Sequence, residues 1–200
     1  SSDKVRRKAS EEAPDPEEIL LEAEEKMEGA LKFLADEFKK IRTGRATPAL
    51  IEGVRVDYYG APTPLRQIAS IAVPDPRSLL VKPYDPSSLK EIEKAIQKAD
   101  LGLNPVNDGK FIRINIPPLT EERRKQIASV VKDLAEKAKI SVRNARREAN
   151  RLIDELDDEG HISEDDAMRY KKEIQKMTDK YVEKIDTALE KKTCLLYTSD

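Results

Sequence analysis

The stretch SVRNARREANR, residues 141–151, carries the side chains of this 200-residue chain that are best suited to binding chemistry. Its four arginines are Arg143, Arg146, Arg147 and Arg151, in a chain whose formal net charge is only −2. Between Lys139 and Arg151, Glu148 alone offsets five cations. A planar guanidinium forms forked hydrogen bonds with phosphate, whereas an ammonium acts as a point charge. The pattern favours salt-sensitive, weakly sequence-selective contacts to nucleic acid.

The alternative is a solvated helix face supported by local ion pairs to neighbours such as Glu155. Helical phase bears on this choice, because successive residues turn by about 100°. Arg143, Arg147 and Asn150 are then expected roughly opposite the apolar stripe of their helix. Arg146 and Lys139 are expected along one shoulder. These side chains should face outward, where they could meet the phosphates of a structured RNA or DNA.

Residues suited to catalysis are few. His161 is the only histidine and lies beside an expected turn, where a loop or cap role outweighs catalysis. The run Glu164-Asp165-Asp166 suits the positive end of a helix better than a metal site. No Gly-Lys-Ser/Thr follows Gly102 or Gly109, so no phosphate loop is expected. The sequence therefore predicts no enzyme, no cofactor and no metal.

Two further features narrow the chemistry. Tyr58-Tyr59 at a strand end could stack on bases, but such a pair is more often one core and one surface residue. The single cysteine, Cys194, allows neither a disulfide framework nor a cysteine zinc site within the chain. We expect a soluble intracellular protein in a reducing compartment, since no apolar run is long enough for a membrane span or a secretory signal.

Three long amphipathic helices are predicted to position the arginines. The first covers 15–43, with Asp15 as cap and Gly44 as its end. The second covers 120–158, and its expected stripe is Ile127, Val131, Leu134, Ala138, Val142, Ala145, Ala149, Leu152 and Leu156. The third runs from a capping box at Ser163 to about Lys192. Complementary stripes predict an antiparallel three-helix bundle formed by 16–43 and 118–192.

The segment 44–117 is predicted to be an inserted α/β domain, because ten of the twelve prolines and five of the seven glycines fall between Gly44 and Pro118. Strands are expected at 54–59, 65–73, 78–84 and 111–116, with a helix from Ser87 or Ser88 to about Ala99. The insert leaves and re-enters the bundle at adjacent linkers, which predicts a hinge. The expected hinge residues are Thr43, Gly44, Arg45, Ile116, Pro117 and Pro118.

The acidic residues are expected to gather at the end of the bundle far from the hinge. Residues 11–28 carry nine Asp or Glu, and residues 152–167 carry eight with no Lys or Arg. Antiparallel packing would bring these segments together. A negative end would repel free nucleic acid and restrict where the bundle can dock.

Three blocks closely resemble the ribosome recycling factor family: KIRTGRATPALIEGVRVDYYGAPTPLRQIAS (40–70), ADLGLNPVNDGKFIRINIPPLTEERRK (99–125) and VRNARREAN (142–150). The resemblance runs from about Glu18 to Lys191. It implies an α+β fold in which a long antiparallel three-helix bundle carries an inserted small β/α/β domain. It also implies an L-shaped molecule of tRNA-like dimensions.

The resemblance implies a translation factor that binds the ribosome after peptide release. With elongation factor G and GTP, such a factor dissociates the ribosome into subunits and releases mRNA and deacylated tRNA. The residues that match the family's large-subunit ribosomal RNA contacts are Arg42, Arg45, Arg143, Arg146 and Arg147. The inserted domain is expected to face the translocase and the small subunit. The factor is expected to be a monomer that binds no membrane.

Both ends depart from the bacterial pattern of that family. Residues 1–15 are expected to form a disordered extension, as in an organellar protein whose transit peptide has been removed. The closeness of the motifs to bacterial ones favours the chloroplast stroma, with the bacterial cytoplasm or the mitochondrion as alternatives. The tail 193–200 is expected to be non-native or disordered, because TCLLYTSD does not continue the charged helical pattern.

Three other functions compete with recycling. A general RNA-binding coiled arm, like those attached to tRNA synthetases, would bind isolated tRNA. An interaction or chaperone-like coiled coil would have no RNA role. An enzyme would require a carboxylate site that the motifs do not indicate.

Overall fold

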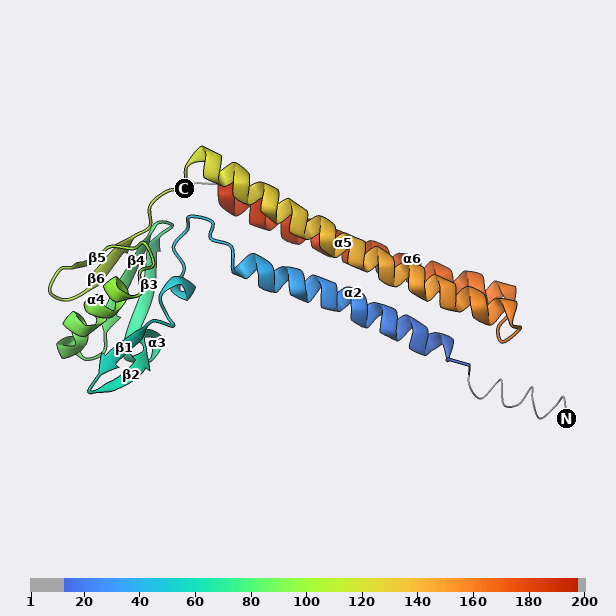
Figure 1. The fold of residues 1–200 in the computed structure, drawn as a ribbon, viewed down its shortest axis with the longest axis horizontal. Coiled ribbons are helices and arrows are strands. Elements are labelled where there is room, and N and C mark those ends of the chain that lie inside the picture. The colour runs from blue at the N-terminus through green and yellow to red at the C-terminus, as the bar shows by residue number, and fades with distance from the viewer. Residues whose placement is uncertain (1–12, 198–200) are drawn as a thin grey trace. The chain divides into compact units, whose positions relative to one another are not determined.

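A computed structural model describes residues 13–197 and shows an α+β protein of two compact units (Figure 1). The helical unit comprises the chain up to Ile41 together with Gln126–Cys194. The inserted unit comprises Arg42–Lys125 together with the chain from Leu195. These boundaries differ by two to eight residues from the predicted 43/44, 117/118 and 192/193. Most of the expected N-terminal extension, residues 1–12, and the last three residues lie outside the described part of the chain.

The helical unit contains α2 (Pro16–Lys39) and all but the first five residues of α5 (Glu121–Asp158) and the last three of α6 (Glu164–Tyr197). Side-chain caps begin all three helices, as their sequences predict. The N–H of Glu17 donates to Asp15 Oδ1 at 3.0 Å, that of Arg123 to Thr120 Oγ1 at 3.1 Å, and that of Asp166 to Ser163 Oγ at 3.0 Å. Each bond satisfies one amide that the helix itself leaves unpaired.

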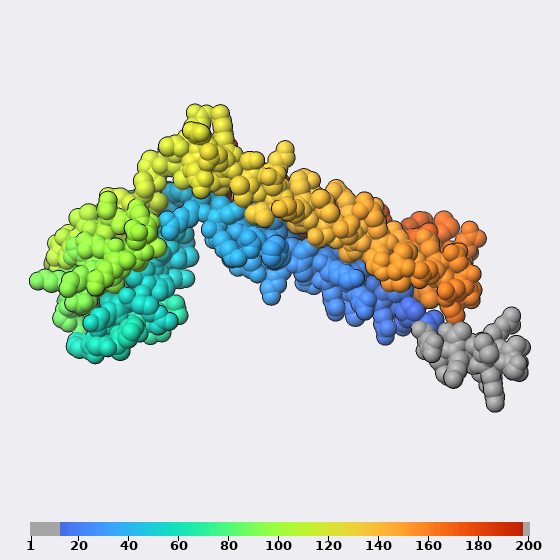
Figure 2. Space-filling view, viewed as in Figure 1, coloured from blue at the N-terminus to red at the C-terminus, as the bar shows by residue number. Residues whose placement is uncertain are grey.

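The bundle core confirms the antiparallel order. One buried cluster joins Ile19 and Leu20 of α2 to Leu156 at the end of α5 and Ala167 at the start of α6. The acidic segments of the three helices therefore meet at one end, as predicted. Figure 2 shows α2 and α5 side by side along one face of this unit.

The buried stripe of α5 differs from the predicted one at two positions. Ala135 and Ile153 are fully buried, whereas their predicted neighbours Leu134 and Leu152 are only partly buried. A single long helix has two neighbours here, so its buried face is wider than one stripe. Either of two adjacent residues can then lie at the centre of that face, so the sequence pattern does not decide between them.

Two helix ends also differ from expectation. α2 ends at Lys39, and the next two N–H groups, of Lys40 and Ile41, donate to the carbonyls of Glu37 and Phe38, so the chain leaves the helix before Gly44. α6 continues through Tyr197, and the prediction that it stops near Lys192 was wrong. Leu196 is 3% exposed and lies eleven residues after buried Ile185, which is about three helical turns.

The inserted unit holds a four-stranded antiparallel sheet in the order β3-β4-β6-β5 and a hairpin of β1 and β2. The strands are β1 (Arg55–Tyr58), β2 (Ala61–Pro64), β3 (Ala69–Asp75), β4 (Ser78–Pro83), β5 (Pro105–Asn107) and β6 (Ile112–Asn115). Helix α4 (Leu89–Lys98) packs Ile92 and Ile96 into a core with Leu79, Val81 and the isoleucines of β6. Two short 3₁₀ turns, η1 (Pro48–Leu50) and η2 (Pro86–Ser88), complete the unit with α3 (Leu65–Ile68).

Sequence patterns misplaced three of these elements. Leu65–Ile68 is a helical turn and not the start of a strand. Ala61–Pro64 forms a strand where a turn was expected, because it pairs with β1 from Arg55↔Pro64 to Tyr58↔Ala61. The short strand β5 was not predicted. Its three residues carry no alternation of their own, and pairing with β6 defines it.

One face of the sheet is open to solvent. A row of directly paired residues crosses it from Ala72 through Leu80 and Arg113 to Val106. Val106 is 54% exposed, Arg113 and Ala72 are exposed, and Leu80 is half-buried. The core and α4 occupy the opposite face, so this row is available to a partner.

A single turn anchors both chain crossings on the inserted unit. The N–H of Ala46 donates to Pro76 O, and the N–H of Ile116 donates to Arg77 O, each at 2.7 Å. Asp75 holds the turn itself, since it accepts from the N–H of Arg77 at 2.9 Å and from Ser78 Oγ at 2.6 Å. These bonds lower the pKa of Asp75, the Ser78 hydroxyl having the largest effect.

Candidate nucleic-acid interface

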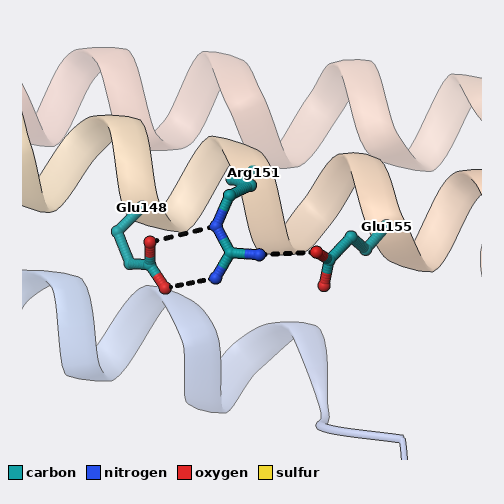
Figure 3. Close-up of polar contacts among 3 residues, drawn as sticks. All are labelled: Glu148, Arg151 and Glu155. Atoms are coloured by element: carbon teal, nitrogen blue, oxygen red, sulfur yellow. Dashed lines mark hydrogen bonds and ion pairs between the residues drawn. The ribbon is translucent and has the colours of Figure 1, made fainter.

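The cations of α5 fall into two groups that the sequence does not distinguish. Arg151 belongs to the first group, because two glutamates of its own helix bind it (Figure 3). Its Nε and Nη2 donate to Glu148 at 3.1 and 2.6 Å, and its Nη1 donates to Glu155 at 2.5 Å. The contact with Arg151 lowers the pKa of Glu148 and raises that of the guanidinium. This arginine is engaged within the protein.

Lys139 also belongs to the first group. Its side chain is only 14% exposed, and its ammonium contacts Asp186 of α6 as well as Glu136 one turn earlier at 3.6 Å. The stem of the lysine is thus buried between α5 and α6. Its charge is neutralised locally, so Lys139 serves the packing of two helices.

The second group comprises Arg143, Arg146 and Arg147. No carboxylate among residues 13–197 lies within ion-pair distance of these three arginines. Arg147 is exposed, and its Nη1 donates to the neutral amide of Asn144 at 3.1 Å. Arg143 is half-buried and makes no hydrogen bond to any described residue. Three uncompensated guanidinium groups therefore lie within five residues of one helix.

Arg146 is held differently from its neighbours. It is half-buried, and its Nη1 donates to Gln175 Oε1 of α6 at 3.2 Å. Its Nε is buried and finds no partner in the described chain. Arg146 and Lys139 were expected to face outward from one shoulder of α5, but that shoulder meets α6, and both side chains are partly buried there.

Asn150 corrects one expectation. It was expected to point away from the core with Arg143 and Arg147, but its Oδ1 is buried without a partner among the described residues. Four residues turn a helix by about 400°, so Asn150 lies only about 40° from Arg146 and shares its side of α5. The contact of α5 with α6 is wide enough to cover both Asn150 and Arg146. Helical phase alone does not predict how wide that contact is.

Arg42 and Arg45 belong to the inserted unit. Nη1 of Arg42, which is exposed, donates to the carbonyl of Leu101 at 3.2 Å. Nε of Arg45, which is half-buried, donates to the carbonyl of Leu195 at 3.2 Å. These contacts hold the chain just after α2 against its own unit.

The predicted hinge residues have unequal environments. Thr43 and Gly44 are half-buried, and Gly44 has φ = 77°, a conformation that glycine adopts without strain. Pro117 and Pro118 are exposed and follow the last bond of the sheet. Ile116 is 8% exposed and belongs to the core of the inserted unit, so it is an anchor of the second crossing.

The remaining candidate sites look structural. His161 lies in the turn after α5, with Nε2 3.3 Å from Glu159. Glu164, Asp165 and Asp166 form the first turn of α6, and no cluster of three metal-ligand residues occurs within residues 13–197. None of the described helices is long and apolar enough to cross a membrane. Tyr58 packs against the core, while Tyr59 is 80% exposed and donates to Asp85 at 2.6 Å.

The model of the ribosome recycling factor family matches residues 34–196, a range that includes the arginines of α5 and both chain crossings. The chain belongs to the ribosome recycling factor family. It is 54% identical to the ribosome-recycling factor of Nitratidesulfovibrio vulgaris (strain DP4) over 172 residues, which cover 86% of this chain and 92% of that protein. It is 51% identical to that of Halalkalibacterium halodurans over 88% of this chain and 95% of the relative.

Solved structures agree with this assignment. A ribosome recycling factor in solution is 39% identical and superposes with a TM-score of 0.70, covering 92% of this chain and 97% of the other. The Thermus thermophilus factor, described together with Escherichia coli elongation factor G on a post-termination complex, is 45% identical with a TM-score of 0.61. It is matched over 92% of this chain and 100% of its own. The family resemblance and the α+β fold are thereby confirmed, and the family's role is in protein biosynthesis.

The sequence did not predict the hydrogen-bond partners by which the arginines of α5 differ. Gln175 and Asp179 are four residues apart on α6 and so share one face, but nothing in their types marks them as neighbours of Arg146. Asn144, three residues before Arg147 on α5, was missed as well. The roles of Gln175 and Asp179 follow from the pairing of α5 with α6.

Proposed function

We propose that this protein binds the post-termination ribosome and, with elongation factor G and GTP, dissociates it into subunits, releasing mRNA and deacylated tRNA. Family membership supports this proposal, as does the likeness to a factor described with elongation factor G on a post-termination complex. The chain itself acts as a binding protein here and not as an enzyme. Hydrolysis of GTP by elongation factor G supplies the energy.

The binding surface on the ribosome is formed in this proposal by Arg143, Arg146 and Arg147, which contact large-subunit ribosomal RNA. The observation that carries it is the division of the α5 cations. Two of five are neutralised within the protein, while these three have only neutral partners or none in the described chain. A guanidinium without a carboxylate partner keeps its full charge for phosphate. Arg42 and Arg45 of the inserted unit also contact this RNA in the proposal.

In this proposal the inserted unit acts as a lever, which elongation factor G pushes and which turns about the hinge. Its open sheet face, from Ala72 to Val106, is the surface that we assign to the translocase and the small subunit. The hinge consists of two segments. Thr43–Arg45 lies between α2 and the anchor at Ala46, and Pro117–Pro118 lies between the anchor at Ile116 and α5. Because one turn holds both anchors, the two crossings move together when the lever is pushed. The factor acts as a monomer.

The target is a ribosome of bacterial type. Relatives of about half-identical sequence from several bacteria support this assignment. The bacterial cytoplasm and the chloroplast stroma both contain such ribosomes, and the chloroplast stroma is the location we favour from the sequence motifs. A dissociation assay with each kind of ribosome compares the two.

Alanine substitution tests the arginine surface. We expect Arg146→Ala and Arg143→Ala each to weaken ribosome binding about 10-fold, since a hydrogen bond to a charged group contributes roughly 1.5 kcal/mol or more. Each change should also make the slope of log affinity against log salt concentration less steep, by the contribution of about one phosphate contact. Sedimentation with purified ribosomes over a salt series measures both quantities.

Arg151→Ala is the matched control, since it removes the same group and the same charge from the same helix. Glu148 and Glu155 already occupy Arg151, so its removal should change binding less than 2-fold. Equal losses for Arg151→Ala and Arg146→Ala would show that net charge matters and that the assigned surface is wrong. Binding to free tRNA as tight as to ribosomes would favour the general RNA-binding arm.

A further inference from the structure

Among Arg143, Arg146 and Arg147 of α5, Arg146 is the one that bonds to a described residue of a second helix. Its Nη1 bonds across the α5–α6 contact to Gln175 Oε1 at 3.2 Å. Arg147 bonds within α5, to Asn144 three residues away, and Arg143 has no bond to a described residue. The guanidinium of Arg146 is therefore tied to α6 by a hydrogen bond, whereas neither Arg143 nor Arg147 makes a hydrogen bond to a described residue of α6.

Asp179 fixes which end of the Gln175 amide faces Arg146. Gln175 Nε2 donates to Asp179 Oδ1 at 2.8 Å, one turn further along α6. A carboxylate accepts but does not donate, so the NH₂ group of the amide must face Asp179. The amide oxygen is then directed to Arg146. The three side chains form a chain of hydrogen bonds from Asp179 through Gln175 to Arg146.

The neutral amide keeps the charge of Arg146 available. A glutamate at 175 would bind the guanidinium as Glu148 and Glu155 bind Arg151, and would compete with phosphate. The amide accepts a hydrogen bond and brings no negative charge. It restricts the arginine while leaving its remaining N–H groups uncompensated.

We propose that Gln175 and Asp179 are positioning residues, which hold the guanidinium of Arg146 in its RNA-binding orientation already in the free protein. This inference rests on the proposed function, in which Arg146 contacts ribosomal RNA. A long side chain that is already ordered loses less conformational freedom on binding, so affinity rises without a new contact. Residues on α6 thereby contribute to a surface that α5 presents.

A double-mutant cycle tests the coupling. Gln175→Met removes the acceptor and keeps a similar volume, and it should weaken binding of the full chain to purified large subunits about 3- to 10-fold. In the Arg146→Ala background the same change should have no further effect. Gln97→Met, at an exposed position on α4, is the matched control and should bind as wild type. Thermal unfolding of each variant reports whether the bundle is intact.

Two substitutions at Asp179 separate orientation from charge. Both remove one negative charge near the arginines, which by electrostatics alone should tighten binding to RNA. Asp179→Asn keeps an oxygen that can accept from Gln175, and it should bind as well as wild type or better. Asp179→Ala loses the acceptor and should bind several-fold more weakly despite the gain in positive charge.

The outcomes distinguish this inference from the function on which it rests. If Arg146→Ala binds like wild type, the RNA contact is refuted and the positioning role falls with it. If Arg146→Ala weakens binding but Gln175→Met weakens it equally in both backgrounds, the contact stands and the positioning role is overturned. Tighter binding by Asp179→Ala would also overturn it.

Discussion

Gly44→Ala tests the conformation of the first chain crossing. Gly44 has φ = 77°, in the left-handed region that residues with a Cβ atom rarely adopt. A Cβ built there lies 2.9 Å from Cγ and 3.3 Å from Cδ1 of Leu119. Gly44 and Leu119 both belong to the inserted unit. Two costs therefore apply, one from the backbone and one from the side-chain contact.

The magnitude follows from these two costs and one opposing effect. The left-handed conformation costs an alanine roughly 1–2 kcal/mol. Rotation of Leu119 away from the new methyl group adds about 0.5–1.5 kcal/mol, since a flexible side chain can give way. Reduced freedom of the unfolded chain offsets about 0.4–1 kcal/mol. We expect Gly44→Ala to lower the free energy of unfolding of the inserted unit by roughly 0.5–3 kcal/mol.

Urea unfolding followed by amide NMR spectra measures this change, because resonances report each unit separately. Adding Leu119→Ala removes the steric cost and leaves the backbone cost, so the double variant should still be less stable than Leu119→Ala alone. Gly29→Ala is the matched control in α2. Gly29 lies mid-helix, and a methyl group added there would meet nothing within 4 Å, so alanine should stabilise by about 0.5–1 kcal/mol. A gain in stability from both substitutions would show that neither the left-handed conformation of Gly44 nor its contact with Leu119 disfavours alanine.

Two further predictions concern the bundle core and the hinge. Ile153→Ala should cost the helical unit about 2–5 kcal/mol in urea unfolding, while Leu152→Ala should cost roughly half as much, because Ile153 is fully buried and Leu152 is not; equal costs would contradict the observed phase of α5. A covalent cross-link between the helical and inserted units, made in a Cys194→Ser background, should preserve ribosome binding and abolish subunit splitting by light scattering. Full splitting by the linked protein would exclude the hinge mechanism.

Local patterns in the chain were sufficient for most of the helical architecture. Capping by Asp15, Thr120 and Ser163 depends on residues within three positions of the amides they satisfy. The inserted domain was visible because proline and glycine change backbone preferences wherever they occur. The arginine surface was predicted from helical phase, which is a property of one helix.

Short strands and exact burial could not be predicted in the same way. β5 has three residues, too few for a period, and it exists because β6 offers it hydrogen-bond partners. The burial of Ile153 rather than Leu152 depends on where α2 and α6 lie against α5. The helical end of the chain through Tyr197 was missed because Leu196 is three turns from the last buried isoleucine of the pattern, Ile185.

Amino-acid order alone was enough to predict where the helices begin and to place the arginines of α5 outside its apolar stripe, since each depends on interactions within a few residues. Arg151 is neutralised within α5 itself, but the partners of Lys139 and Arg146 were established by the packing of α6 against α5. This packing joined Lys139 to Asp186 and Arg146 to Gln175 across 47 and 29 positions of sequence. Partners so distant in the chain meet only when two helices settle into one register, and that register is a property of the folded bundle.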